Sequence, residues 1–319
     1  MNRILTSLWR LSVRLLLCWT FSLAGVAQAQ TIVFYNVENL FHPDNDSLRA
    51  DDDFTPEGKY RWSKRRYYQK LHQIARVLTC IDNQYPTLVG LAEVENAQCL
   101  NDLCRHMPQA PYRFIHFDSP DHRGIDVALL YDSLHFHPDT AIQIPIYLDS
   151  ATTTRDILYV RGTFMDKLIN PSTNKLLNLY VCHLPSQLGG AATSAWKRER
   201  AKTALRNHYT SILAQDSVAN IIVMGDMNAA PQNDLPKLIN LSTDKTIKQS
   251  THKHNGIWTC LDQFYLTPYT LHHQPIIFSP SWLLEYDRKY LGYRPKRTFN
   301  GFRYNKNGFS DHLPILLKL

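Results

Sequence analysis

Two polar residues in the stretch NIIVMGDMNAAP, residues 220–231, have the types and the spacing that a hydrolytic site needs. Asp226 and Asn228 follow a short apolar run and lie two positions apart, so in extended chain both side chains point to one side. A carboxylate and an amide presented together can accept a proton, hold a water and hydrogen-bond a phosphoryl oxygen. Taken alone, GDMN is equally compatible with an Asx-rich turn that caps a strand, and Gly225 before it indicates a close backbone approach.

Other predicted strands end on polar residues of the same kind. A buried apolar strand that ends on an unpaired glutamate, as the strand before Glu93 does, is costly unless the charge is matched, and metal coordination is one way of matching it. Histidines and carboxylates that converge at one edge of a sheet sandwich would supply oxygen ligands for Mg²⁺ together with acid and base groups. The residues at the predicted strand ends are Asn36, Glu93, His183, Asp226, Asn228, Asp262, Asp311 and His312.

The motifs that contain these residues resemble, in their order along the chain, those of the endonuclease/exonuclease/phosphatase superfamily, the deoxyribonuclease I-like group. The motifs are NVENLF, LAEVEN, RGIDVALLY, CHLPSQ, GDMNAAP, LDQFYL and FSDHLP. The resemblance runs from about Thr31 to the C-terminus. It implies an α+β fold, a four-layer α/β/β/α sandwich of two packed mixed sheets flanked by helices. It also implies a divalent-metal phosphoesterase site at one edge, with Mg²⁺ as the cofactor and Mn²⁺ as an alternative.

The resemblance also implies roles for single residues. Glu93 would be the principal metal ligand, assisted by Asn36 and Asp311. Asp226 would position or deprotonate the attacking water, and Asn228 would hold a phosphate oxygen. For Glu93 the alternative is a surface glutamate in an acidic turn.

Three further residues complete the predicted site. His312 would be the catalytic histidine, oriented by Asp262 through a direct hydrogen bond, and His183 would stabilise the phosphate or protonate the leaving oxygen. A buried structural histidine is the alternative at both positions. Arg123, beside Gly124, could clamp a phosphate with its planar fork or could be a solvated surface arginine.

Many strands and few helices must position these side chains. The apolar patterns predict strands over residues 31–35, 88–92, 126–131, 157–164, 176–182, 221–224, 260–266 and 313–319. One helix follows Arg61, and its predicted buried face carries Tyr68, Leu71, Ile74, Ala75 and Leu78. A second helix over 195–214 is predicted to present a basic outer face of Lys197, Arg198, Arg200, Lys202 and Arg206. This content favours a sheet sandwich over a repeat of strand–helix–strand units.

The first 29 residues have the pattern of a secretory signal peptide. Arg3, Arg10 and Arg14 precede an apolar centre, and Ala27-Gln28-Ala29 is a small-residue cleavage site. The apolar run is shorter than the ~20 residues of a membrane-spanning helix, which is the alternative. We therefore predict a bacterial protein that is secreted or periplasmic, with a single domain over residues 30–319 and no membrane span.

The net charge and the cysteine content limit which substrates and which disulfides the protein could have. Removing the leader lowers the formal charge from +7 to +4, which permits a polyanionic partner without requiring one. We expect a monomer that acts on a phosphoester, with nucleic acid as the substrate; a lipid or inositol phosphate is the alternative, and a non-catalytic binding module is a third. Five cysteines remain after cleavage, with Cys99 and Cys104 as the nearest local pair for a disulfide.

A basic and aromatic segment near the C-terminus admits two interpretations. It could contact a phosphate backbone and stack bases, or it could order a long loop over the site. Its residues are Arg288, Lys289, Tyr290, Tyr293, Arg294, Lys296, Arg297, Phe299, Phe302 and Tyr304.

Overall fold

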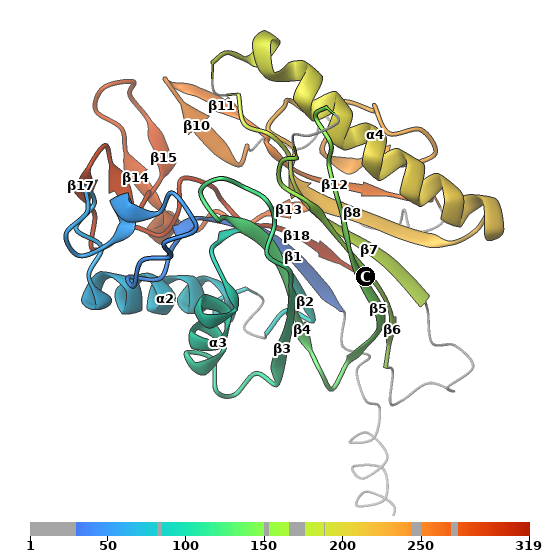
Figure 1. The fold of residues 1–319 in the computed structure, drawn as a ribbon, viewed down its shortest axis with the longest axis horizontal. Coiled ribbons are helices and arrows are strands. Elements are labelled where there is room, and N and C mark those ends of the chain that lie inside the picture. Colours follow the sequence, from blue (N-terminus) through green and yellow to red (C-terminus); the bar gives the residue numbers. More distant parts are fainter. Residues whose placement is uncertain are drawn as a thin grey trace, which may run out of the picture.

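The computed structural model describes residues 30–81, 85–149, 153–165, 176–187, 189–243, 250–268 and 274–319 (Figure 1). The predicted leader lies outside these residues. The helices are α2 (Lys64–Thr79), α3 (Ala97–Arg105) and α4 (Ala191–Gln215), with short 3-10 helices at Asp52–Phe54, Ser281–Leu283 and Leu241–Thr243. The strands are β1 (Thr31–Leu40), β2 (Leu88–Val94), β3 (Tyr112–His116), β4 (Asp126–Asp132), β5 (Phe136–Ile144), β6 (Ile157–Phe164), β7 (Leu176–His183), β8 (Asn220–Asp226), β9 (Ile239–Asn240), β10 (His252–His254), β11 (Ile257–Thr259), β12 (Asp262–Leu266), β13 (Ile276–Ile277), β14 (Leu284–Tyr286), β15 (Tyr293–Pro295), β16 (Phe299–Asn300), β17 (Arg303–Tyr304) and β18 (Ile315–Lys318).

Two mixed sheets of six strands each form the centre of the molecule. The first has the order β13-β18-β1-β2-β4-β3, and the second has the order β5-β6-β7-β8-β12-β9. The pairs β1–β2 and β7–β8 are parallel, so the chain ends of these strands meet at a common edge of each sheet. The other pairs in both sheets are antiparallel.

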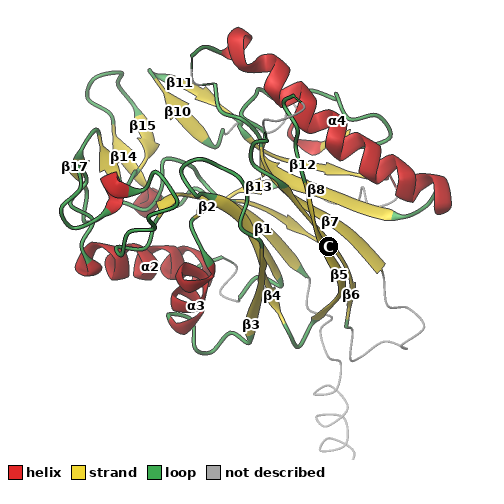
Figure 2. Cartoon of the chain, viewed as in Figure 1, coloured by secondary structure: helices red, strands yellow, loops and turns green. Residues whose placement is uncertain are grey.

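The helices cover the outer faces of the two sheets, which gives the predicted four-layer α/β/β/α sandwich (Figure 2). The main core includes buried residues of both sheets, such as Phe34 and Met224, and the inner face of α2. A second core lies under α4, where Leu205 and Tyr209 pack with Val223. Gly90 lies where the sheets meet, since a Cβ there would stand 2.5 Å from the terminal methyl of Met224.

Gly225 permits a close approach of two strands, as its position in the sequence indicates. A Cβ at Gly225 would lie 2.3 Å from the carbonyl oxygen of Cys182 in the neighbouring strand β7. Real Cβ atoms do not come so close to backbone, so only glycine fits between β7 and β8 here.

Both predicted helices are present, but one side chain in each faces the other way from the prediction. In α2, Tyr67 is fully buried and Tyr68 is half exposed, because Tyr67 lies one helical turn before Leu71 on the buried face. In α4, Arg198 is buried rather than on the basic outer face. Its guanidinium donates to the carbonyls of Ala191 and Pro185, and so ties the helix start to the loop after β7.

Cys99 and Cys104, the nearest local pair of cysteines, do not form a disulfide. Both thiols are free and both lie in α3. Five positions along a helix place two side chains about 140° apart around the axis and about 7.5 Å apart along it, too far for a disulfide. The other described cysteines, Cys80, Cys182 and Cys260, are also free thiols.

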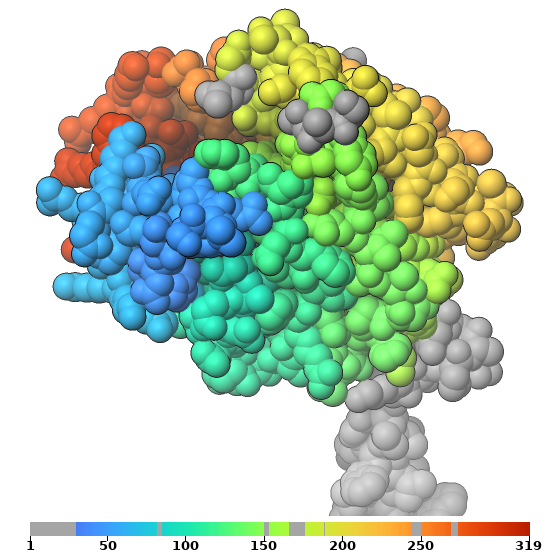
Figure 3. Space-filling view, in the orientation of Figure 1, coloured from blue at the N-terminus to red at the C-terminus, as the bar shows by residue number. Residues whose placement is uncertain are grey.

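The basic and aromatic C-terminal segment packs mainly against the protein itself. The ring of Phe299 lies 4.7 Å from that of Tyr60 and 5.7 Å from that of Trp62, which joins the segment to the loop after β1. Figure 3 shows these N-terminal (blue) and C-terminal (red) parts side by side. Arg294 pairs with Glu285 at 2.8 Å. The segment therefore serves mainly to order a long connection. No helix among the described residues is long and apolar enough to cross a membrane.

Candidate active site

The register of the second sheet aligns three of the predicted site residues. Asp226, the last residue of β8, pairs with His183 at the end of β7 and with Asp262 at the start of β12. Directly paired residues on adjacent strands point to the same face, so the three side chains form one row across the sheet edge. His183, Asp226 and Asp262 are each buried.

The first sheet contributes Asn36 from the middle of β1, which continues past the predicted strand end to Leu40, and Glu93 from the end of β2. The Asn36 amide nitrogen donates to Asp226 Oδ2 at 3.1 Å and lies 3.4 Å from Glu93 Oε1. The Glu93 carboxylate also accepts the backbone N–H of Asn39 at 2.9 Å. Glu93 has a positive φ of 65°, which turns its side chain at the strand end. The edges of the two sheets thus meet at these side chains.

Asp262 and His312 form the direct contact expected from the sequence, with Asp262 Oδ2 2.8 Å from His312 Nδ1. The two residues lie in different sheets rather than on neighbouring strands of one sheet. Asp262 begins β12 of the second sheet, whereas His312 precedes β18 of the first. The pair forms because the facing edges of the two sheets are packed together. It leaves Nε2 of His312 directed toward Asp226, with Nε2 3.8 Å from Asp226 Oδ2.

The charges around His312 and Asp226 favour an imidazolium next to a carboxylate. Burial opposes protonation of His312, but the carboxylates of Asp262, Asp226 and Asp311 outweigh it and raise the pKa of His312 well above its usual value. Burial raises the pKa of Asp226 to about 6, with the positive charge of His312 acting in the opposite direction. Asp226 is therefore a carboxylate at neutral pH whose proton affinity is higher than usual.

Arg155 joins the site, and sequence reasoning missed it. Its buried guanidinium donates from Nη1 to His183 Nε2 at 2.9 Å and from Nε to Asp121 at 2.9 Å. A guanidinium only donates, so Nε2 of His183 is an acceptor and the proton of the neutral ring lies on Nδ1. Burial and then the charge of Arg155 hold the pKa of His183 well below its usual value. Nη1 of Arg155 also donates to the Leu184 carbonyl at 3.2 Å, so this arginine holds His183 and the loop after β7 together. Nothing in the run TTTRD distinguished this arginine from a surface one.

Asn228 and Arg123 lie at the border of this cluster. The backbone N–H of Asn228 donates to Asp226 Oδ1 at 2.9 Å, and its side-chain amide N–H donates to the Leu184 carbonyl at 2.9 Å. Asn228 therefore fixes the orientation of the Asp226 carboxylate. The side chain of Arg123 is 45% exposed and lies 3.9 Å from Asp121, which leaves it free to reach a ligand. Its charge also lowers the pKa of His183, after burial and Arg155.

Asp311 lies between two histidines. Its carboxylate is 3.8 Å from Nε2 of His252 and 4.0 Å from Nε2 of His312. Burial opposes ionisation of Asp311, but the two histidines outweigh burial and lower its pKa. His252, in the run THKH at the start of a β hairpin, is a second residue that sequence reasoning missed, because no strand end or family motif marks it.

The residues at this edge fit a divalent cation. Carboxylates of Glu93, Asp226, Asp262 and Asp311 gather here, and Oδ1 of Asp262 is buried with no hydrogen-bond partner among the described residues. The Asn36 amide nitrogen lies between two of these carboxylates, where a positive group is favourable. Hard oxygen donors of this kind are the ligands that Mg²⁺ and Mn²⁺ prefer.

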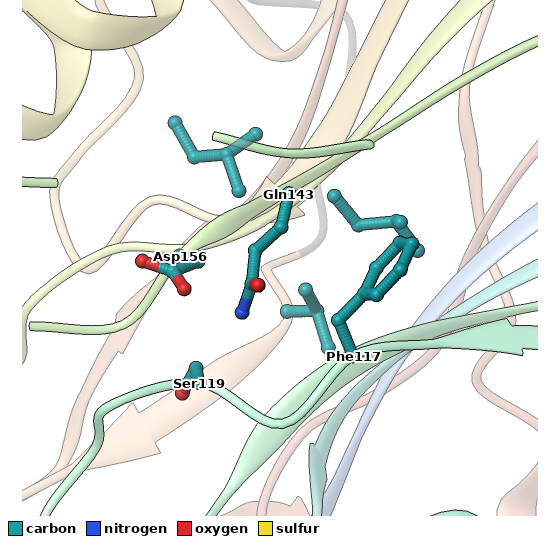
Figure 4. A pocket seen from close by; sticks show the side chains of 7 residues that line it. Phe117, Ser119, Gln143 and Asp156 are labelled. Atoms are coloured by element: carbon teal, nitrogen blue, oxygen red, sulfur yellow. The ribbon is translucent and has the colours of Figure 1, made fainter. Parts of the chain in front are cut away.

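A small cavity next to Asp156 is not the substrate site. It has a volume of about 10 Å³, enough for one water, and Ser119, Gln143 and Asp156 supply its polar lining (Figure 4). Burial raises the pKa of Asp156 to about 6.

The chain belongs to the endonuclease/exonuclease/phosphatase family, whose model matches residues 31–319. Members of this family are phosphoester hydrolases, and the chain is a phosphoesterase of this family.

Solved structures of the same fold cover nearly the whole described chain. A truncated TDP2 of Caenorhabditis elegans is 14% identical with a TM-score of 0.58, covering 91% of this chain and 96% of its own. A Bacteroides thetaiotaomicron protein of the family is 14% identical with a TM-score of 0.56, covering 91% and 97%. A mannosyl-6-phosphatase from the same organism is 14% identical with a TM-score of 0.54, covering 90% and 98%. Comparison with curated protein sequences gives no match.

Proposed function

We propose that this protein is a secreted or periplasmic phosphodiesterase that hydrolyses nucleic acid by in-line attack of water, with Mg²⁺ as its cofactor and Mn²⁺ as an alternative. The observation that supports this best is the Asp226 carboxylate, held 3.8 Å from the Nε2 atom of a His312 that Asp262 orients. A base next to a cationic hydrogen-bond donor is what water attack on a phosphate requires.

Each residue has a proposed part in the reaction. Asp226 accepts the proton of the attacking water, and Asn228 fixes the rotamer of Asp226 through the bond to Oδ1. His312 donates from Nε2 to a phosphoryl oxygen, since Nδ1 is occupied by Asp262. Arg155 and Arg123 offset the negative charge that develops on the phosphate. Glu93 and Asn36, with Asp311 as a further candidate ligand, would hold a divalent cation, and such a cation would supply Lewis-acid chemistry at the phosphate.

Two observations bear on the substrate. The formal charge of +7, or +4 without the leader, permits a polyanion such as DNA or RNA, and the two arginines at the site favour a phosphate-bearing substrate. A small phosphomonoester or a lipid or inositol phosphate is the second candidate, because Arg294, Lys296 and Phe299 are used in contacts within the chain rather than held free for a nucleic acid. A solved structure of similar fold is a mannosyl-6-phosphatase, which is compatible with the second candidate.

A substrate panel tests this proposal. Mature protein is incubated with plasmid DNA, RNA, a phosphodiester dye, mannose 6-phosphate, inositol phosphates and sphingomyelin, each with Mg²⁺ and with EDTA. We expect Mg²⁺-dependent cleavage of nucleic acid that is lost in His312→Ala. Release of phosphate or phosphocholine with both nucleic acids intact would contradict a nuclease and support the second candidate substrate class. Absence of hydrolysis of every ester would support a non-catalytic binding module.

The cellular location and the assembly state are also proposals. The N-terminus of the mature protein should be Gln30, found by mass spectrometry in a periplasmic or extracellular fraction. The mature chain should elute as a monomer in size-exclusion chromatography with light scattering. An intact Met1 on a cytoplasmic protein would contradict the proposed secretion.

A further inference from the structure

The side chains of His252, Asp311 and His312 form a compact group of metal-type donors beside the proposed Mg²⁺ ligands. One donor atom from each lies within 4.8 Å of the others. His252 Nε2 and Asp311 Oδ2 are 3.8 Å apart, and His312 Nε2 and Asp311 Oδ1 are 4.0 Å apart. Donors around a tetrahedral cation with bonds of about 2.0–2.1 Å lie about 3.3–3.5 Å from one another, so side-chain shifts of about 1 Å would close the group around an ion.

The backbone holds His252 rigidly against His312. The two residues form an antiparallel bridge, and their rings lie 4.8 Å apart. Thr251, the residue before His252, accepts the backbone N–H of Leu313 and, through its hydroxyl, that of Asp262. His252 is thus fixed by the same hydrogen bonds that hold the Asp262–His312 pair. Such support from neighbouring hydrogen bonds is what a preorganised metal site needs.

His312 already has the outer contact that is typical of a metal-bound histidine. Its Nδ1 lies 2.8 Å from the Asp262 carboxylate, so Nε2 is the ring atom that can bind an ion, and binding releases its proton. Histidine ligands usually donate their other ring N–H to a carboxylate in this way. The side chains of His252 and Asp311 are 15% and 29% exposed, so an ion can reach the group from solvent.

The donor set selects the kind of cation. Two imidazole nitrogens and one carboxylate suit Zn²⁺ or Co²⁺, whereas Mg²⁺ prefers an all-oxygen set. We propose that His252, Asp311 and His312 bind Zn²⁺ or Co²⁺ at a second site, which shares Asp311 with the proposed Mg²⁺ site but does not include Glu93 or Asn36, with water in the remaining position. A bound cation takes Nε2 of His312 away from the phosphate. This consequence rests on the proposed function: Zn²⁺ or Co²⁺ bound at this second site inhibits the hydrolysis that Mg²⁺ supports.

Metal titration of tag-free mature protein tests the site without any substrate. Co²⁺ is added in the presence of excess Mg²⁺, and its visible absorption reports nitrogen coordination. We expect one equivalent to bind in the wild type and the affinity to fall by at least about tenfold in His252→Ala. His254→Ala is the matched control: His254 is in the same strand and exposed, its ring is 6.3 Å from that of His252, and it lies outside the group.

Further outcomes decide the proposal. His252→Asn, which keeps most of the side-chain volume, is measured in parallel with thermal unfolding, so that loss of fold is distinguished from loss of a ligand. Equal Co²⁺ affinity in wild type and both folded His252 variants, or displacement of Co²⁺ by equimolar Mg²⁺, would overturn the site. A second arm measures inhibition of the Mg²⁺ reaction by one equivalent of Zn²⁺. If no phosphoester is hydrolysed, the proposed function fails, while the Co²⁺ titration still decides the metal site.

Discussion

At the scale of single residues, the site depends on hydrogen bonds that fix the orientation of His312 and Asp226. Asp262 is buried, and its Oδ2 holds His312 Nδ1 at 2.8 Å, so it sets both the ring orientation and the tautomer. Asn228 does the same for Asp226 through a backbone N–H. Asp262 and Asn228 thus position the two groups, His312 and Asp226, that we propose act on the substrate.

The substitution Asp262→Asn should separate orientation from folding. An asparagine side chain has nearly the same shape as aspartate, so the fold should persist, but its amide can present an N–H to His312 and favour the wrong tautomer. We expect kcat to fall by about 10³–10⁴ with a small change in Tm. Steady-state kinetics and thermal unfolding measure the two effects. A loss below about tenfold would mean that another group orients His312.

Arg155→Met should show whether the buried arginine serves the site. The variant loses the Nη1 contact to His183 and leaves Asp121 without this partner. We expect kcat to fall by about 10²-fold, the usual effect of removing one preorganised donor. Arg161→Met is the control, because Arg161 is exposed and pairs with Asp139 outside the site. Equal kinetics of the two variants would show that Arg155 is only structural.

At the scale of elements, strand register decides which side chains meet. Asp226 faces His183 and Asp262 because β7, β8 and β12 pair in one register, and a slip of one residue would turn each side chain to the other face. Gly225 protects this register, since the Cys182 backbone lies where its Cβ would be.

Gly225→Ala should therefore be more damaging than Gly90→Ala. At Gly225 the new Cβ would meet backbone atoms of Cys182, whereas at Gly90 it would meet the flexible end of Met224. We expect Gly225→Ala to cost upward of about 1–3 kcal/mol and to reduce activity, with a smaller cost for Gly90→Ala. Urea unfolding of both variants measures the difference. A greater cost at Gly90 would contradict this account of the strand contact.

At the scale of the whole molecule, the site lies where two sheets are joined, so ligands at the site should stabilise the fold. A cation that binds Glu93 and Asn36 in the folded protein, and not in the unfolded chain, adds stability by mass action. At a concentration of 100 times its Kd this amounts to about 2.7 kcal/mol. Mg²⁺ should therefore raise the Tm of the wild type, and the rise should be lost in Glu93→Gln. An identical rise in both proteins would place the ion elsewhere.

The pH dependence of stability should reveal the buried carboxyl of Asp156. Burial raises its pKa from the usual value to about 6, and the nearby Asp126 adds to this effect. A raised carboxyl pKa means that folding favours the protonated form, so its contribution is complete below about pH 4 and is lost as the pH rises through about 6. Asp156→Asn should have an increased Tm at pH 7.5 and an unchanged Tm relative to wild type at pH 4. Calorimetry at the two pH values decides this, and a lower Tm at pH 7.5 would show that the ionised carboxylate is stabilising.

The sequence by itself determined the family, the four-layer fold and the residues at the strand ends. Apolar runs such as Ile221 to Met224 indicate buried strands, and the order of the polar motifs that follow such runs indicated the family, although a single motif such as GDMN did not. The predicted Asp262–His312 contact followed from motif order and is present at 2.8 Å.

Only the tertiary structure decided which residues outside the motifs belong to the candidate active site. Arg155 precedes a strand without any distinguishing pattern, and it enters the site because the packing of β6 and β7 brings it to His183. His252 meets Asp311 through a bridge between segments 60 positions apart, while Cys99 and Cys104, near in sequence, are kept apart by a helix. Strand and helix periodicity is a local property of the chain, whereas contacts between the two sheets depend on how their edges meet, and no local pattern encodes that.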